Sequence, residues 1–188
     1  MTSRRSSLQQ NSWTRDGYYI STKPSDIPIE KLNAYFASDL LYWAKPLSEA
    51  AMRETLESSI PFGLYAMDSS TRNGEDTTNL IGFARCVTDF TTILYLTDVF
   101  VDPAYQGKGL GSWLIGCVGD VIEPMPDLRA SLLFTGDWQR TVPFYEKLLG
   151  MHVMESRRGE DGQSGEGLAL MERLGRGDPD FEKQITRG

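Results

Sequence analysis

The chain has 188 residues, of which 40% are hydrophobic and 11% aromatic, so it can bury a full core and does not belong to the disordered class. Its formal net charge of −7 excludes a protein that binds nucleic acid through a basic face, because such a face has to offset the phosphates. The acidic balance is compatible with a cationic amine as substrate, and also with a solvated acidic surface. Since no apolar run approaches the roughly 20 residues that span a bilayer, we expect no membrane partner.

The two ends of the chain are polar. The first residues, MTSRRSSLQQNS, lack the apolar segment of a secretory signal, so a disordered tail is expected over 1–16, with an organelle presequence as the alternative. A flexible tail is expected over 176–188, and a single domain between them, over 17–175. The only two cysteines, Cys86 and Cys117, lie in apolar patterns and indicate reduced thiols of an intracellular, cytoplasmic protein.

The first half of the domain is expected to contain, in chain order, a strand, two helices and two strands, at 18–22, 29–40, 48–58, 62–67 and 80–88. The segment LYWAKP at 41–46 interrupts the pattern between the two helices, and Ser48 is the expected N-cap of the second helix. Turn-forming residues at 67–78 predict an exposed loop between the two strands, and a similar stretch recurs at 157–167.

The stretch from Thr92 to Glu123 predicts a strand, a glycine turn and a helix. The β-branched and aromatic residues up to Val101 suit a buried strand, which Asp102-Pro103 ends because proline cannot donate to a ladder. Glycines then alternate with other residues at the start of a helix that has one apolar face. Such a turn leaves backbone N–H groups unpaired where the helix dipole favours an anion, so this stretch predicts a phosphate or pyrophosphate site.

The remaining elements are expected to be a strand at 129–135, a helix at 139–149 with Asp137 as its cap, and a hairpin of strands at 152–155 and 168–173. The predicted order is therefore β-αα-βββ-α-β-α-ββ. It describes a mixed α/β protein and not a strict βαβ alternation.

Spacing decides which phosphate ligand the glycine turn favours. A Walker A loop needs G-x-x-x-x-G-K-[ST], and a dinucleotide fingerprint needs G-x-G-x-x-G directly after the strand; neither occurs here. The arrangement Gln106-x-x-Gly109-x-Gly111, after a strand that ends VFVDP, instead resembles the acyl-CoA signature Q/R-x-x-G-x-G/A of the GNAT superfamily of N-acyltransferases. The run YLTDVFV at 95–101 further resembles the spermidine/spermine acetyltransferase branch, which usually has Glu where this chain has Thr97.

This resemblance implies the GNAT fold, a mixed and mostly antiparallel sheet flanked by helices with a splayed central strand pair. It also implies acetyl-CoA as co-substrate and no metal. The backbone of Val99, Phe100 and Val101 would pair with pantetheine as an added strand. The pyrophosphate would lie on the turn formed by Gln106, Gly107, Lys108, Gly109, Leu110, Gly111 and Ser112. The Lys108 ammonium could contact phosphate or lie in solvent.

Two side chains are candidates for the chemistry. Tyr145, in FYEKLLG, stands where the family places a tyrosine as general acid, although the family usually has glycine four residues later and here Gly150 is five later. The alternative for Tyr145 is a core tyrosine with its hydroxyl at the rim. Asp98 is a carboxylate inside an apolar strand, so it could act as a base, as a base through water, or as counter-charge for an ammonium. The alternative role for Asp98 is a structural one, as the partner of an arginine or of a loop amide.

Three further residues are candidates for binding the acceptor. Tyr42 and Trp43 lie in the segment that covers the acceptor pocket in GNAT proteins, and they could hold a cation or stack on a ring, or else pack between helices. Asp137 could line the same pocket or serve only as a helix cap.

The expected function is transfer of an acetyl group from acetyl-CoA to a primary amine of a small molecule, by direct attack in a ternary complex. One alternative is a non-catalytic acyl-CoA-binding module on the same fold. A second arises because FYEKLLGMHV also resembles vicinal-oxygen-chelate domains, but these bind a metal through His and Glu on several strands, and this chain has one histidine, His152. A homodimer is compatible with the sequence.

Overall fold

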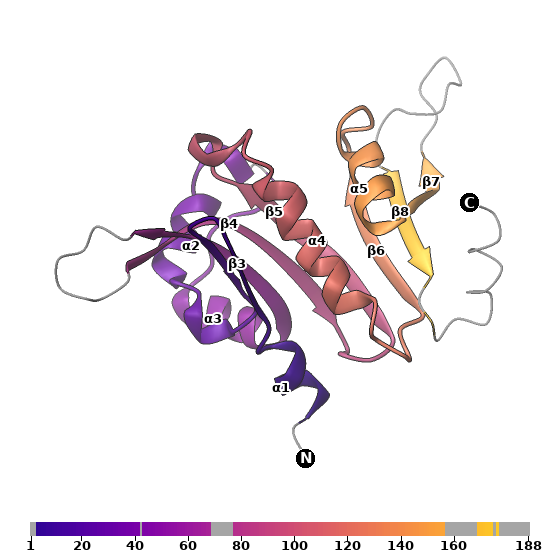
Figure 1. Cartoon of the computed structure of the whole chain (residues 1–188), viewed down its shortest axis with the longest axis horizontal. Helices are drawn as coiled ribbons and strands as arrows, with labels where there is room; N and C mark the ends of the chain where they lie inside the picture. Colours follow the sequence, from indigo (N-terminus) through magenta and orange to yellow (C-terminus); the bar gives the residue numbers. More distant parts are fainter. Residues whose placement is uncertain (1–2, 42, 69–76, 157–168, 175, 177–188) are drawn as a thin grey trace. The chain divides into compact units, whose positions relative to one another are not determined.

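The computed structural model describes residues 3–41, 43–68, 77–156, 169–174 and 176. These residues divide into two compact units, each considered below by itself (Figure 1). Unit 1 comprises Met1–Val87 and Asp98–Leu114, and unit 2 comprises Thr88–Thr97 and Ile115–Gly188. Strand β5 (Ile93–Val101) and helix α4 (Leu110–Ile122) each contribute residues to both units. The loop predicted at 67–78 falls mostly outside the described residues, and so does the one predicted at 157–167.

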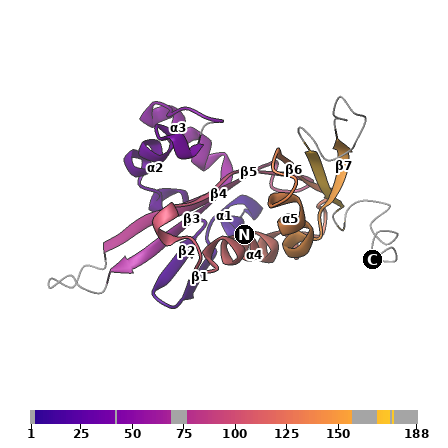
Figure 2. The ribbon, with the colours of Figure 1, turned by 90° about the horizontal axis from the view of Figure 1, so that it is seen from above.

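Unit 1 is built on antiparallel strands that follow one another in sequence. Its elements are α1 (Arg4–Leu8), β1 (Ser12–Arg15), β2 (Tyr18–Ser21), α2 (Ile29–Phe36), α3 (Glu49–Glu57), β3 (Ser59–Asp68) and all but the last residue of β4 (Thr77–Thr88). Short 3-10 turns occur at Pro24–Asp26, Asp39–Leu41 and Pro103–Tyr105. Helices α2 and α3 lie over one side of β3 and β4 (Figure 2).

The core of unit 1 lies between the two helices and the strands. Apolar residues of α2, α3 and the strands form one buried cluster, including Phe36, Leu56, Phe83 and Phe100. Strands β4 and β5 approach each other closely at Gly82, where an added Cβ would lie 2.9 Å from the Phe100 carbonyl oxygen. Only glycine fits at that position, so the backbone of β5 is held tightly against β4 just before the glycine turn.

Unit 2 contains the first half of β5 with β6 (Ala130–Thr135), α5 (Thr141–Leu149), β7 (His152–Ser156) and β8 (Ala169–Leu174). The first half of β5 pairs in parallel with β6, from Ile93 with Ala130 to Leu96 with Leu133. β6 pairs antiparallel with β8, and β8 with β7. The complete strand order, β1-β2-β3-β4-β5-β6-β8-β7, confirms the predicted mixed and mostly antiparallel sheet.

The predicted disordered tail over residues 1–16 is wrong for most of its length, because these residues contain α1 and β1. The Ser3 hydroxyl caps α1 by accepting a hydrogen bond from the Ser6 N–H at 3.1 Å. The Gln9 side chain donates to the Glu57 carbonyl at 2.8 Å and to the Ser59 carbonyl at 2.6 Å. Polar contacts to the backbone therefore hold this segment, and a search for apolar periodicity does not detect them. Among the described helices, none has the length and apolar character needed to cross a membrane.

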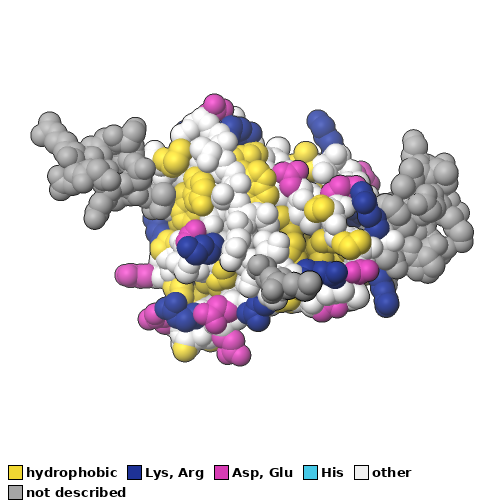
Figure 3. All heavy atoms as spheres, turned by 60° about the horizontal axis from the view of Figure 1, so that its bottom comes forward, with side chains coloured by type: hydrophobic (Ala, Val, Ile, Leu, Met, Phe, Trp, Pro, Cys, Tyr) yellow, Lys and Arg dark blue, Asp and Glu magenta, His cyan; other side chains and the backbone are white. Residues whose placement is uncertain are grey.

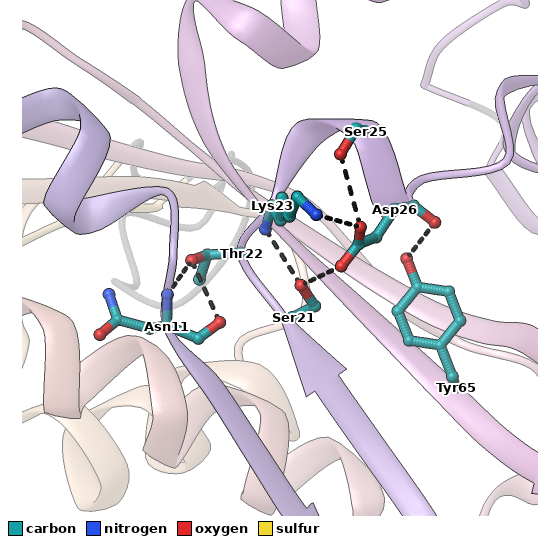
Figure 4. A network of polar contacts seen from close by, with 7 residues as sticks. All are labelled: Asn11, Ser21, Thr22, Lys23, Ser25, Asp26 and Tyr65. Atoms are coloured by element: carbon teal, nitrogen blue, oxygen red, sulfur yellow. Dashed lines mark hydrogen bonds and ion pairs between the residues drawn. The ribbon is translucent and has the colours of Figure 1, made fainter.

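A polar network fixes the connection from β2 to α2 (Figure 4). The Asn11 N–H donates to Thr22 Oγ1 at 2.9 Å, which joins the start of the β1 segment to the end of β2. The Ser21 hydroxyl donates to Asp26 Oδ2 at 2.8 Å, and the Tyr65 hydroxyl donates to the Asp26 carbonyl at 2.9 Å. The short turn that leads into α2 is thereby tied to both β2 and β3, so the start of this helix has a fixed position.

Each unit contains one buried cysteine. Cys86 lies on β4 in unit 1 and Cys117 lies on α4 in unit 2, and neither is in a disulfide. Burial raises the pKa of the Cys86 thiol far above its ordinary value. On the surface, acidic and basic side chains are interspersed over the face drawn in Figure 3, so the negative net charge is not gathered in one patch of that face.

Candidate active site

The glycine turn is held to the end of β5 by side-chain hydrogen bonds. The Gln106 side-chain amide donates to the Val101 carbonyl at 2.9 Å, and Asp102 Oδ1 accepts from the Ala104 N–H at 2.9 Å. Gly107 has a φ of +79° and Gly109 a φ of +72°, a region that residues with a Cβ rarely adopt. These two glycines are therefore required by the backbone.

Helix α4 begins directly after this turn. The Trp113 N–H donates to the Gly109 carbonyl at 3.1 Å and closes the first turn of the helix. The N–H groups of the residues before Trp113 have no partner within the helix, as at every helix start. Gly111 is not required by its conformation, since an added Cβ would lie 3.9 Å from Val101 Cγ2, an ordinary contact. The predicted strand, turn and helix start are thus present at the predicted residues.

Arg15, on the β1 strand, lies beside the glycine turn and was missed by sequence reasoning. Its guanidinium lies 4.8 Å from the centre of the Trp113 ring, and its Nη2 donates to the Lys108 carbonyl at 3.5 Å. The Lys108 ammonium lies 3.4 Å from the Tyr18 hydroxyl. Arg15 therefore brings a positive charge from a distant part of the chain to the turn, which already contains that of Lys108. Asp16 and Gly17, both with positive φ, form the hairpin between β1 and β2, and an Asp-Gly pair is a hairpin signal that the sequence did offer.

Asp98 lies on β5 one residue before Val99 and forms an ion pair with Arg85 of β4. Arg85 Nε and Asp98 Oδ2 are 2.7 Å apart, and the two side chains are 20% and 10% exposed. Asp98 has a φ of +55°, which aspartate tolerates better than most residues. Arg85 is thus the arginine partner that is expected if Asp98 has a structural role. The guanidinium offsets a carboxylate that would otherwise be costly to bury.

A pocket of about 330 Å³ in unit 1 contains this ion pair in its wall. Its apolar wall is drawn from α2, the following loop, α3 and β4, and consists of Phe36, Ala44, Pro46, Leu47, Met52 and Phe83. Its polar lining consists of Lys45, Thr55, Arg85 and Asp98. Trp43 is 47% exposed and does not belong to the described lining, and Tyr42 lies outside the described residues.

Unit 2 carries the other two predicted site residues. Tyr145 lies in the middle of α5, is 8% exposed, and its burial raises the pKa of its hydroxyl to about 12. This hydroxyl is therefore protonated at neutral pH. Asp137 caps the turn that leads into α5, because its Oδ1 accepts from the Arg140 N–H at 2.9 Å. Gly150, with a φ of +61°, follows the last residue of α5, so the glycine that comes one residue later than in the family pattern is the C-terminal cap of the helix.

Comparison with known proteins decides the family. The family model described as the acetyltransferase (GNAT) family matches residues 32–151, well over half of the chain. The chain belongs to the GNAT acetyltransferase family. A Gibberella zeae protein assigned as an acetyltransferase is 36% identical over 169 residues, which cover 86% of this chain and 92% of that protein.

Two other relatives differ in the acceptor that their names give. A histone acetyltransferase of Glycine max is 35% identical over 98 residues, covering 51% of this chain but only 41% of that protein. The solved structure of spermidine N-acetyltransferase from Vibrio cholerae, in complex with CoA and spermine, superposes with a TM-score of 0.58 and 16% identity, covering 86% of this chain and 97% of that one. At that identity the likeness concerns the fold.

The GNAT assignment fixes the reaction type. The protein is an acyl-CoA-dependent N-acyltransferase that uses acetyl-CoA as its co-substrate. The protein is therefore an enzyme and not a non-catalytic acyl-CoA-binding module. In the part of the chain that the structure describes, no group of three or more His, Cys, Asp or Glu side chains could hold a metal ion.

Proposed function

We propose that this GNAT enzyme acetylates a primary amine of a small molecule, which attacks the thioester of acetyl-CoA directly in a ternary complex. The observation that carries the proposal is the pocket beside Asp98, because β5 continues from Asp98 into the Val99–Val101 segment and the glycine turn. Its volume of about 330 Å³ is at the small end of the roughly 300–1,000 Å³ found for small-molecule sites. Such a volume suits a small acceptor better than a folded protein surface.

The cofactor is assigned to the strand end and the turn. The Phe100 side chain is buried at 6% exposure, so only its backbone is available to pair with pantetheine, together with that of Val99 and Val101. The N–H groups from Gly107 to Ser112 receive the pyrophosphate, favoured by the positive end of the α4 dipole. Arg15 and Lys108 add two positive charges beside these N–H groups.

The reaction forms a C–N bond between the neutral amine and the acetyl carbon and breaks the C–S bond of the thioester. The amine loses a proton to water, and the leaving thiolate gains one from a protein acid. Tyr145 is proposed to donate the proton to the thiolate; this role rests on its place in the family motif and on a hydroxyl that stays protonated at neutral pH. Asp98 is proposed to accept a hydrogen bond from the amine and to orient it, since its carboxylate is already engaged by Arg85.

The test is release of CoA thiol from acetyl-CoA over a panel of small primary amines and of short peptides, with the acetylated product identified by mass. We expect turnover above hydrolysis with at least one small amine, and none with the tertiary-amine analogue of that compound. Turnover with peptide amines but with no small amine would overturn the proposal, because the acceptor would then be a polypeptide.

A further inference from the structure

We propose that the acceptor carries a carboxylate in addition to its primary amine, on an apolar body, and that it is not a polyamine. The inference rests on the proposed function, and it concerns the charge of the pocket that contains the Arg85–Asp98 pair. In chemical terms, the acceptor class is an amino acid, with the amine and the carboxylate separated by one or several carbons.

The charged groups of the pocket leave an excess of positive charge. The lining contains the ionisable side chains of Lys45, Arg85 and Asp98. Asp98 and Arg85 are in contact at 2.7 Å, so their charges largely cancel at longer range. The ammonium of Lys45, an exposed residue of the loop after α2, is the remaining charge. Among the described residues that line this pocket, Asp98 is the one acidic side chain.

The acidic residues of the neighbouring helix do not alter this balance. α3 contributes only Met52 and Thr55 to the pocket. Its residues Glu49, Glu54 and Glu57 line a different surface depression, together with Arg53. None of these three glutamates belongs to the lining of the pocket that contains Asp98, even though α3 forms part of its wall.

The charge balance of the pocket favours one class of amine over another. A polyamine such as spermidine carries several ammonium groups at neutral pH, and a site that binds it needs an excess of carboxylates. Here a second ammonium would meet Lys45 and the Arg85 guanidinium. An amino acid suits the same lining, because its amine can donate to Asp98 while its carboxylate pairs with Lys45. Phe36, Met52 and Phe83 then contact the apolar part between or beside the two groups.

The experiment compares matched acceptors with the intact enzyme and acetyl-CoA. The panel contains amino acids whose amine and carboxylate are one to five carbons apart, each with its neutral amide, and also spermidine. We expect kcat/KM for at least one amino acid to exceed that of its amide by about two- to fivefold, the ratio that one exposed ion pair can supply. This advantage is expected to shrink at high salt, because Lys45 is exposed.

Two variants assign the effect to the pocket. Lys45→Glu should abolish the preference for the carboxylate over the amide, whereas Lys31→Glu, an equal change of charge on α2 outside the pocket lining, should retain it. Turnover that is greatest with spermidine, or equal for acid and amide at every spacing, would overturn the inference and leave acetylation of small amines intact. Absence of turnover with every small amine, when peptides react, would instead overturn the proposed function.

Discussion

The ion pair between Arg85 and Asp98 leads to a prediction about stability. Replacing Arg85 by Met keeps most of the apolar stem of the side chain and removes the guanidinium. The Asp98 carboxylate then remains in a wall where it is 10% exposed, without the partner 2.7 Å away. We expect the enzyme to lose stability because this carboxylate is largely removed from water.

The magnitude follows from the burial of the two groups. Removing one partner of a fully buried ion pair costs about 3–5 kcal/mol, and unit charges 4 Å apart attract by about 4 kcal/mol at an effective dielectric constant of about 20. Arg85 is 20% exposed and Asp98 10%, so water screens the pair in part and we expect a cost of about 2–3 kcal/mol. At roughly 2–4 °C per kcal/mol, the midpoint of thermal unfolding falls by roughly 4–12 °C.

The matched control is the pair between Arg53 and Glu49 on α3. The distance is the same, 2.7 Å, but these side chains are 55% and 74% exposed. Arg53→Met should therefore cost less than about 1 kcal/mol. The double variant Arg85→Met with Asp98→Asn should recover most of the lost stability, because it removes the buried carboxylate together with the guanidinium, and asparagine also tolerates a positive φ. Equal melting shifts for Arg85→Met and Arg53→Met would refute the reasoning.

Three further predictions concern the cofactor and the reaction. Gly109→Glu should weaken CoA binding by more than about 100-fold in calorimetry, because a side chain at a φ of +72° costs about 1–2 kcal/mol and its carboxylate repels the pyrophosphate. The control Gly111→Ala should change the Kd for CoA by less than about threefold. Equal CoA affinities of the two variants would contradict the assigned site. Arg15→Ala should raise the Kd for CoA by about five- to tenfold, whereas Arg129→Ala, in unit 2, should not change it. An unchanged Kd for Arg15→Ala would show that Arg15 does not contribute to CoA binding. Tyr145→Phe should lower kcat by about 10- to 100-fold at pH 7, and this defect should shrink above about pH 8.5, where a free thiolate leaves without a proton. The wild type should keep its acid in this range because the pKa of Tyr145 is about 12, so a defect independent of pH would contradict the general-acid role.

Most of the fold could be predicted because its elements bear regular apolar patterns. Strand β5, the glycine turn and α4 lie where the sequence placed them, and Ser48 caps α3 as expected. The two elements that were missed, α1 and β1, are held by side-chain contacts to the backbone and by pairing with β2, and neither leaves a periodic apolar signal.

The site could be predicted less completely, because its decisive contacts join residues far apart in the sequence. The sequence indicated that Asp98 needs a partner but not that Arg85 supplies it, since the contact depends on the register of β4 and β5. Arg15 lies 93 residues from the Lys108 carbonyl to which it donates, and only the hairpin brings it there. The positive φ of Asp98 likewise has no signature in the residue types around it.

The distribution of the two cysteines gives the enzyme an internal probe of its opening. Cys86 belongs to unit 1 and Cys117 to unit 2, and both are buried, so a small alkylating reagent reaches each thiol only when its own surroundings open. The labelling rate at each cysteine, read by mass spectrometry in native buffer, therefore measures the free energy of opening of one unit at a time. Bound CoA stabilises the closed form of any unit that must open to release it. Added CoA will therefore slow labelling at Cys86 alone if unit 1 opens independently, and at both cysteines if the two units open together.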